Sequence, residues 1–94
     1  MPRLRFSSDA RDDLKEIARY IARDKPIAAR RWVARIKDKC HLLANNPEIG
    51  DPCEDLGENV RCSYVGNYVI FFRRVDACVE ISRVIRGDRD TQSL

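Results

Sequence analysis

The sequence predicts a two-layer α+β domain, in which a helical hairpin packs on one face of a mostly antiparallel sheet. Three observations lead to this fold class. A short alternating segment is followed by two amphipathic helical segments, the link between these is very short, and three apolar runs separated by two-residue turn signals come after them. A chain of 94 residues supports one hydrophobic core, so residues 1–94 are expected to form a single domain.

The first half of the chain predicts a strand and two helices. Residues 2–7 alternate, with Leu4 and Phe6 on one face, as expected of a short strand. Ser7 or Ser8 is expected to cap the first helix, which ends near residues 24–25, and Pro26 suits the first turn of the second. The apolar residues recur with the helical period. They are Ala10, Leu14, Ile17 and Ile21 in the first helix, and Ala29, Val33, Ile36, Cys40 and Leu43 in the second.

The second half predicts a loop and three strands. Residues 46–59 contain two prolines, two glycines and five acidic residues, which is typical of a loop. The strands are expected at 60–65, 68–75 and 78–86, with turns at Gly66-Asn67 and Asp76-Ala77. The resulting order is strand, helix, helix and three strands, so two helices can cover one face of the sheet.

Two-residue turns fix which side chains share a face, because pairing register sets the faces. The larger apolar set is expected to pack on the helices: Val65, Tyr68, Ile70, Phe72, Ile81 and Ile85. The opposite face then holds Cys62, Tyr64, Val69, Phe71, Ser82 and Val84, with Arg73, Glu80 and Arg86 at its rim. A three-residue first turn would reverse the assignment of the second strand alone.

This second face is apolar, and no further helix is predicted to cover it. An apolar patch with a charged rim is typical of an interaction site. Two other covers stay open, since either the acidic loop 46–59 or the C-terminal tail could fold over it. On this reading Arg83 points to the helix side, where a structural ion pair with Asp13 or Glu16 is expected. Arg86, on the second face, and Arg89, after the turn, are expected to contact a target carboxylate or phosphate, or else to be ordinary solvated arginines.

Composition narrows the functional classes. Residues 1–46 carry a net charge of +6 and residues 47–94 a net charge of −3. The sequence has no helix-turn-helix pattern, so direct and specific binding of nucleic acid is not expected. The four cysteines have no metal-binding spacing, so neither a metal site nor a cofactor is predicted. No apolar run approaches the roughly 20 residues that span a bilayer, and no signal-like apolar segment follows Met1. A cytoplasmic protein is therefore expected.

Four stretches resemble toxins of the RelE/ParE superfamily, and its ParE branch in particular. They are SDARDDLKEIARYIARDKPIAARRWV, LANNPEIGDP, VRCSYVGNYVIFFRR and VEISRVIRGDRD, which together cover nearly the whole chain. The resemblance implies the toxin of a type II toxin–antitoxin pair, which assembles with a ParD-like antitoxin and inhibits DNA gyrase. It also implies the fold predicted above.

The RelE branch, whose members cut mRNA in the ribosome, is the alternative. It implies sheet-borne cations and a C-terminal Tyr or His-Tyr, but this chain has Asn59 and Val69 at two of the cationic positions and ends without a Tyr. Arg61 and Arg89 fit the RelE pattern, whereas Arg86 stands where the family often has His. This comparison favours the ParE branch, and no catalytic residue is assigned.

The two arguments together give a set of candidate site residues. Antitoxin contacts are expected on the second face, at Tyr64, Val69, Phe71, Arg73 and Val84. Target contacts that cause toxicity are expected at Arg86 and Arg89, and a structural role at Arg83.

Overall fold

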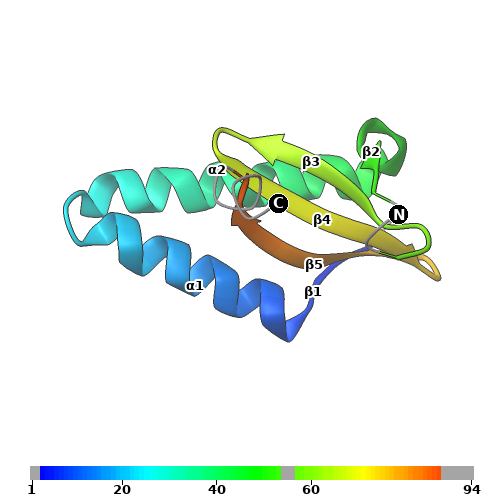
Figure 1. The fold of residues 1–94 in the computed structure, drawn as a ribbon, viewed down its shortest axis with the longest axis horizontal. Coiled ribbons are helices and arrows are strands. Elements are labelled where there is room, and N and C mark those ends of the chain that lie inside the picture. Colours follow the sequence, from blue (N-terminus) through cyan, green and yellow to red (C-terminus); the bar gives the residue numbers. More distant parts are fainter. Residues whose placement is uncertain (1–2, 54–56, 88–94) are drawn as a thin grey trace.

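The chain folds into two layers, with two helices packed on one face of a five-stranded sheet (Figure 1). The computed structural model describes residues 3–53 and 57–87. The elements are β1 (Arg3–Phe6), α1 (Ser8–Ala22), α2 (Pro26–Asn45), η1 (Pro47–Ile49), β2 (Asp51–Pro52), β3 (Arg61–Val65), β4 (Tyr68–Val75) and β5 (Cys78–Arg86). The predicted α+β fold is confirmed. The predicted loop at 46–59 is corrected, because it contains the short 3-10 helix η1 and the two-residue strand β2.

The sheet has the strand order β1-β5-β4-β3-β2. Neighbouring strands are antiparallel except for β1, which pairs in parallel with β5 through Leu4 opposite Val79 and Phe6 opposite Ile81. The first strand of the chain therefore lies beside the last, because the helical hairpin carries the chain across the sheet before β2 begins. Parallel neighbours need such a crossover connection, whereas β3, β4 and β5 are joined by tight turns.

The helices form where the sequence predicts them, and they lie side by side behind the sheet in Figure 1. The Ser7 hydroxyl caps α1 by accepting a hydrogen bond from the Ala10 N–H, and Pro26 starts α2. Both apolar stripes face the sheet, although Ile21 and Val33 are only partly buried. Cys40 of α2 is completely buried, and this burial raises the pKa of its thiol to about 12.

Two glycines are required by close approaches. At Gly50, before β2, an added Cβ would lie 2.4 Å from the Phe72 ring. At Gly66, in the β3–β4 turn, φ is +56° and an added Cβ would lie 2.4 Å from the Trp32 ring. A Cβ at either position would therefore collide with a packed aromatic ring, and Gly66 also adopts a backbone conformation that favours glycine.

The register is regular in the first hairpin and shifted in the second. In the β3–β4 hairpin, Val65 pairs with Tyr68 and Tyr64 with Val69, as predicted. The β4–β5 hairpin starts in the predicted register, with Phe72 opposite Ile81. An irregularity follows, since Phe71 pairs with Arg83 and leaves Ser82 as an extra residue on β5. Such a bulge moves every later side chain of β5 to the opposite face.

The bulge overturns four predicted orientations. Val84 is not on the outer face but in the core, paired with Ile70 and only 1% exposed. Ile85 is not in the core but pairs with Val69 on the face away from the helices. Arg83 and Arg86 exchange faces in the same way, because Arg83 pairs with Phe71 and Arg86 with Tyr68.

Candidate functional site: the uncovered face of the sheet

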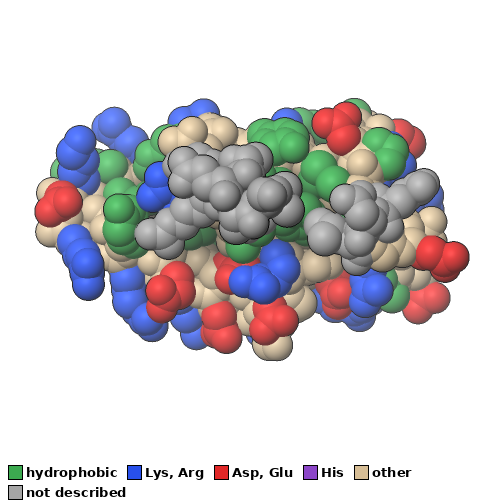
Figure 2. All heavy atoms as spheres, in the orientation of Figure 1, with side chains coloured by type: hydrophobic (Ala, Val, Ile, Leu, Met, Phe, Trp, Pro, Cys, Tyr) green, Lys and Arg blue, Asp and Glu red, His purple; other side chains and the backbone are tan. Residues whose placement is uncertain are grey.

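The sheet face that α1 and α2 leave uncovered carries the candidate site. Here we call it the uncovered face, defined by Cys62, Tyr64, Val69, Phe71 and Ile85. Figure 2 looks onto this side of the molecule and shows hydrophobic side chains at its surface. A hollow of about 530 Å³ opens on it, lined by Ser7, Asp9, Val60, Phe71, Arg73, Glu80, Ser82, Arg83 and Ile85.

The predicted contacts Tyr64, Val69 and Phe71 do share this face, but they differ in exposure. Tyr64 is 59% exposed, Phe71 is half-buried and Val69 is buried. Gly87 contributes to the burial of Val69, because an added Cβ on Gly87 would lie 2.6 Å from Val69 Cγ2. The Gly87 N–H also donates to the Asn67 carbonyl at 2.7 Å, which holds Gly87 beside the β3–β4 turn. The exposed apolar surface is thus centred on Tyr64 and Phe71.

A carboxylate held between two arginines forms the rim of the hollow. Glu80 forms two ion pairs. Its Oε1 lies 3.4 Å from Arg73 Nη2 on β4, and its Oε2 lies 3.3 Å from Arg5 Nη2 on β1. The Glu80 side chain is only 16% exposed, whereas both arginines are half exposed. Charged pairs opposite one another on neighbouring strands stabilise a sheet modestly. They also leave the outer parts of Arg5 and Arg73 available to an acidic partner.

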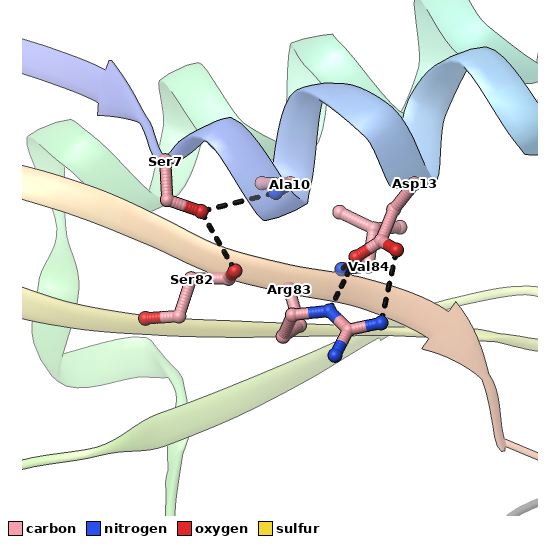
Figure 3. Close-up of polar contacts among 6 residues, drawn as sticks. All are labelled: Ser7, Ala10, Asp13, Ser82, Arg83 and Val84. Atoms are coloured by element: carbon pink, nitrogen blue, oxygen red, sulfur yellow. Dashed lines mark hydrogen bonds and ion pairs between the residues drawn. The ribbon is translucent and has the colours of Figure 1, made fainter.

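The bulge in β5 is held by residues of the first helix, as Figure 3 shows. Where β1 ends, the Ser82 carbonyl accepts a hydrogen bond from the Ser7 hydroxyl at 2.8 Å. Asp13 accepts hydrogen bonds from Arg83 Nε at 2.7 Å and from Arg83 Nη2 at 3.0 Å. It also accepts the Val84 N–H at 2.9 Å. The predicted ion pair between Arg83 and Asp13 is confirmed, although the guanidinium reaches the helix from the opposite face to the one expected.

Arg86, a predicted target contact, lies on the helix side of β5. Its guanidinium lies over the Tyr20 ring of α1, 5.9 Å from the ring centroid. Together with Asp13, Glu16, Ile17, Tyr68, Val84 and Ile85, these two side chains line a second hollow of about 300 Å³. Arg86 is therefore on a different surface from Phe71. Arg89, the other predicted target contact, lies outside the described residues.

Arg61, which matches a cation of the RelE pattern, binds the main chain of the preceding loop. Its Nε and Nη2 donate to the Gly50 carbonyl at 3.2 and 2.8 Å, and Nη2 also donates to the Glu48 carbonyl at 3.2 Å. Charge-assisted hydrogen bonds of this kind fix a guanidinium well. Arg61 therefore holds η1 and β2 against β3.

Sequence reasoning missed two features of this face. Ile85 was placed in the core, and no local signal in the sequence shows the bulge that turns it outward. Cys53 was read as part of a loop, yet its Sγ lies 2.8 Å from Cys62 Sγ. Cys62 is buried, whereas Cys78 is half-buried. The Cys62 thiol is also near the Tyr64 hydroxyl and raises the pKa of that phenol.

The described residues contain neither a metal-binding cluster nor a membrane-spanning helix. Within residues 3–53 and 57–87, no group of three or more His, Cys, Asp or Glu side chains could hold a metal ion. In the same ranges, no helix has the length and apolar content needed to cross a membrane.

With this geometry established, comparison with known proteins identifies the family. Residues 4–91 match the model of the ParE toxin of the type II toxin–antitoxin system parDE. The match spans nearly the whole chain, so the chain belongs to the ParE toxin family and is the toxin of a type II toxin–antitoxin pair. No curated protein sequence matches it significantly.

Solved structures share the fold. A chain of the chromosomal ParDE system from P. aeruginosa is 23% identical, with a TM-score of 0.81 over 92% of this chain and 96% of that one. A chain of the RelBE2 toxin–antitoxin complex from Mycobacterium tuberculosis is 24% identical, with a TM-score of 0.67 over 92% and 99%. YafQ from E. coli is 16% identical, with a TM-score of 0.66 over 95% and 97%. At these identities the likeness is one of fold.

Proposed function

We propose that this toxin inhibits DNA gyrase by direct protein contact and is neutralised by a ParD-like antitoxin. Membership of the ParE family supports the choice of gyrase. The observation that carries the choice of contact over catalysis is the state of the RelE-type positions. Arg61 is engaged with loop carbonyls, and position 69 is a buried valine in place of a cation. Cleavage of RNA without a metal needs cations at the phosphate and an acid–base pair.

The uncovered face is the surface that we propose for the antitoxin. Phe71 lies in its hollow, Tyr64 is exposed beside it, and Ile85 replaces Val84 as the contact from β5. Large apolar side chains within a charged rim act as anchors for an amphipathic partner segment. Structures related to this fold include complexes of toxin with antitoxin, RelBE2 and DinJ–YafQ, which supports a protein partner here. Arg73 would add a contact to an acidic side chain of that partner.

Arg86 is the described residue that we propose for target contact, with Arg89 as a second. The Arg86 guanidinium is presented on the Tyr20 ring at the edge of the hollow of about 300 Å³. A planar guanidinium can recognise a carboxylate or phosphate bidentately, and contact with an aromatic ring favours its position. Ile85 lines both this hollow and the hollow of the uncovered face, whereas Arg86 lines only the former and Phe71 only the latter. Target and antitoxin contacts should therefore be separable by mutation at Arg86 and Phe71.

The function is tested in cells by expressing the toxin with and without its antitoxin, and in vitro with the purified toxin. We expect the purified toxin to block supercoiling by gyrase and to leave mRNA intact on translating ribosomes. Primer extension that shows cleavage between codon positions, with supercoiling unaffected, would establish the RelE-type endonuclease as the function instead.

The separation of the two surfaces has its own test. Arg86→Ala should abolish growth arrest while antitoxin binding is retained, and Phe71→Ala should weaken antitoxin binding by about 1–3 kcal/mol while toxicity is retained. Arg74→Ala, an exposed arginine at the far end of β4, is the matched control and should change neither property. If Arg86→Ala cells still arrest fully, Arg86 is not a target contact, and the basic surface of α2 becomes the next candidate.

A further inference from the structure

Two of the four cysteines are in direct contact at the edge of the uncovered face. Cys62 is on β3 opposite Phe71, and Cys53 directly follows β2. The Cys53 N–H donates to the Val60 carbonyl at 2.8 Å, which holds the residue beside the β3 strand. The Cys53 Sγ lies 2.8 Å from Cys62 Sγ. Cys40 and Cys78 make no sulfur–sulfur contact in the part of the chain that the structure describes.

We propose that Cys53 and Cys62 are a reversible dithiol–disulfide site, which low-molecular-weight disulfides such as oxidised glutathione convert to an intramolecular bond. A disulfide has its sulfurs about 2.05 Å apart. The two sulfur atoms are therefore less than an ångström beyond the length of a disulfide bond. Because this inference rests on geometry alone, it is independent of the choice between gyrase and mRNA as target.

Exposure sets the order of the reaction. Cys53 is half-buried and Cys62 is 4% exposed, so Cys53 is the thiol that an outside disulfide can reach. The Cys53 thiol loses its proton to solvent and attacks one sulfur of oxidised glutathione, which releases one glutathione thiolate and leaves a mixed disulfide. Cys62 then loses its proton and attacks Cys53 Sγ, which releases the second glutathione. In total, two chain thiols are oxidised by two electrons and one glutathione disulfide is reduced to two thiols.

The other two cysteines provide internal controls. Cys40 is completely buried, and its pKa of about 12 keeps the thiol protonated and unreactive at neutral pH. Cys78 is half-buried like Cys53, but it has no neighbouring thiol to complete an intramolecular bond. We therefore expect at most a glutathione adduct at Cys78, which is partly exposed but has no thiol beside it. At Cys53, where the Cys62 thiol is in contact, we expect an intramolecular disulfide bond.

The test uses the full chain in oxidised glutathione, followed by alkylation of free thiols and mass spectrometry. We expect a product lighter by two hydrogen atoms, with Cys53 and Cys62 protected from alkylation and Cys40 alkylated only after unfolding. Dithiothreitol should restore both thiols. The bond closes a short loop, so the oxidised chain should melt about 10 °C higher than the reduced chain.

Variants exclude the alternative pairings. Cys40→Ala/Cys78→Ser keeps the contact and should oxidise like the parent chain, whereas Cys53→Ser should leave Cys62 free and remove the rise in melting temperature. Three results would overturn the proposal. These are a stable glutathione adduct on Cys53 with Cys62 still alkylated, a covalent dimer, or full alkylation of both residues after oxidation.

Discussion

The two faces of strand β4 carry neighbouring phenylalanines with different environments. Phe72 faces the helices and is completely buried, among side chains from α1, α2 and the central strands. Phe71 faces away from the helices and is half-buried in a hollow that is open to solvent. One residue type at adjacent positions therefore contributes to folding on one face and is available for binding on the other. The comparison can be tested by mutations in matched pairs.

Truncation of Phe72 should have the largest effect. Phe72→Ala removes a fully buried ring and should lower the free energy of unfolding by about 3–5 kcal/mol. Phe71→Ala is the matched control and should cost less stability, because its ring is partly in water already. Chemical denaturation measures both variants, and Phe72→Leu serves if the alanine variant does not fold. Equal losses for Phe71→Ala and Phe72→Ala would show that the two faces are equally buried.

Loss of the Asp13 carboxylate should rank second. Asp13→Ala leaves the Val84 N–H and the Arg83 guanidinium without this acceptor and should cost about 2–3 kcal/mol, since unsatisfied donors carry a desolvation penalty. The figure is kept low because half of the Arg83 side chain is exposed and solvent screens the pair. Asp12→Ala, at an exposed position on the same helix, should change stability by less than about 0.5 kcal/mol. Thermal and urea unfolding would both report the difference.

The bulge itself is tested by Val84 and Ile85. Val84→Ala should cost about 2 kcal/mol of stability, because its side chain is packed in the core. Ile85→Ala should cost less stability and weaken antitoxin binding, because Ile85 shares the uncovered face with Val69. Calorimetric titration with antitoxin and denaturant unfolding separate these effects. The reverse result, with Ile85 as the more destabilising site, would mean a regular hairpin without the bulge.

The burial of Cys40 should be measurable as a pH dependence of the free energy of unfolding. The Cys40 pKa is raised from 9.0 to about 12 by burial, so the folded chain keeps a thiol proton that the unfolded chain loses between these values. Stability should therefore be unaffected by this group below pH 9 and should fall by up to about 1.4 kcal/mol per pH unit above it. Cys40→Ala removes this contribution. If the stability of the wild type and of the variant changed with pH in the same way, burial would not raise the Cys40 pKa as described.

The first hairpin was predictable because its determinants are local. Gly66-Asn67 marks a two-residue turn, and such a turn places Val65 opposite Tyr68, as the structure confirms. The helices were predictable for the same reason, since Ser7, Pro26 and the apolar stripes lie within the segments they define. The ion pair of Arg83 with Asp13 was predicted on a wrong premise, because Arg83 was placed beside the core and in fact shares the face of Phe71.

The second hairpin could not be predicted because its determinants are distant in sequence. Ser82 carries no bulge signal of its own, and the extra residue is stabilised by Ser7 and Asp13, about 70 residues earlier in the chain. The bulge occurs where β1 stops pairing with β5, a boundary that only the assembled sheet defines. The contact of Cys53 with Cys62 was missed for a related reason, since the strand β2 that brings them together has only two residues.

The pairing of β1 with β5 also determines when a newly made toxin becomes complete. Synthesis proceeds from the N-terminus, so β1 and the helical hairpin leave the ribosome long before the strand that β1 must join. Until residues 78–81 are made, β1 has no partner in the sheet, and α1 has no β5 against which to pack. A chain whose translation is interrupted before that point lacks both Ile85 and Arg86. A chain that ends before residue 78 therefore lacks the strand that pairs with β1 and against which α1 packs, so its sheet would stay incomplete.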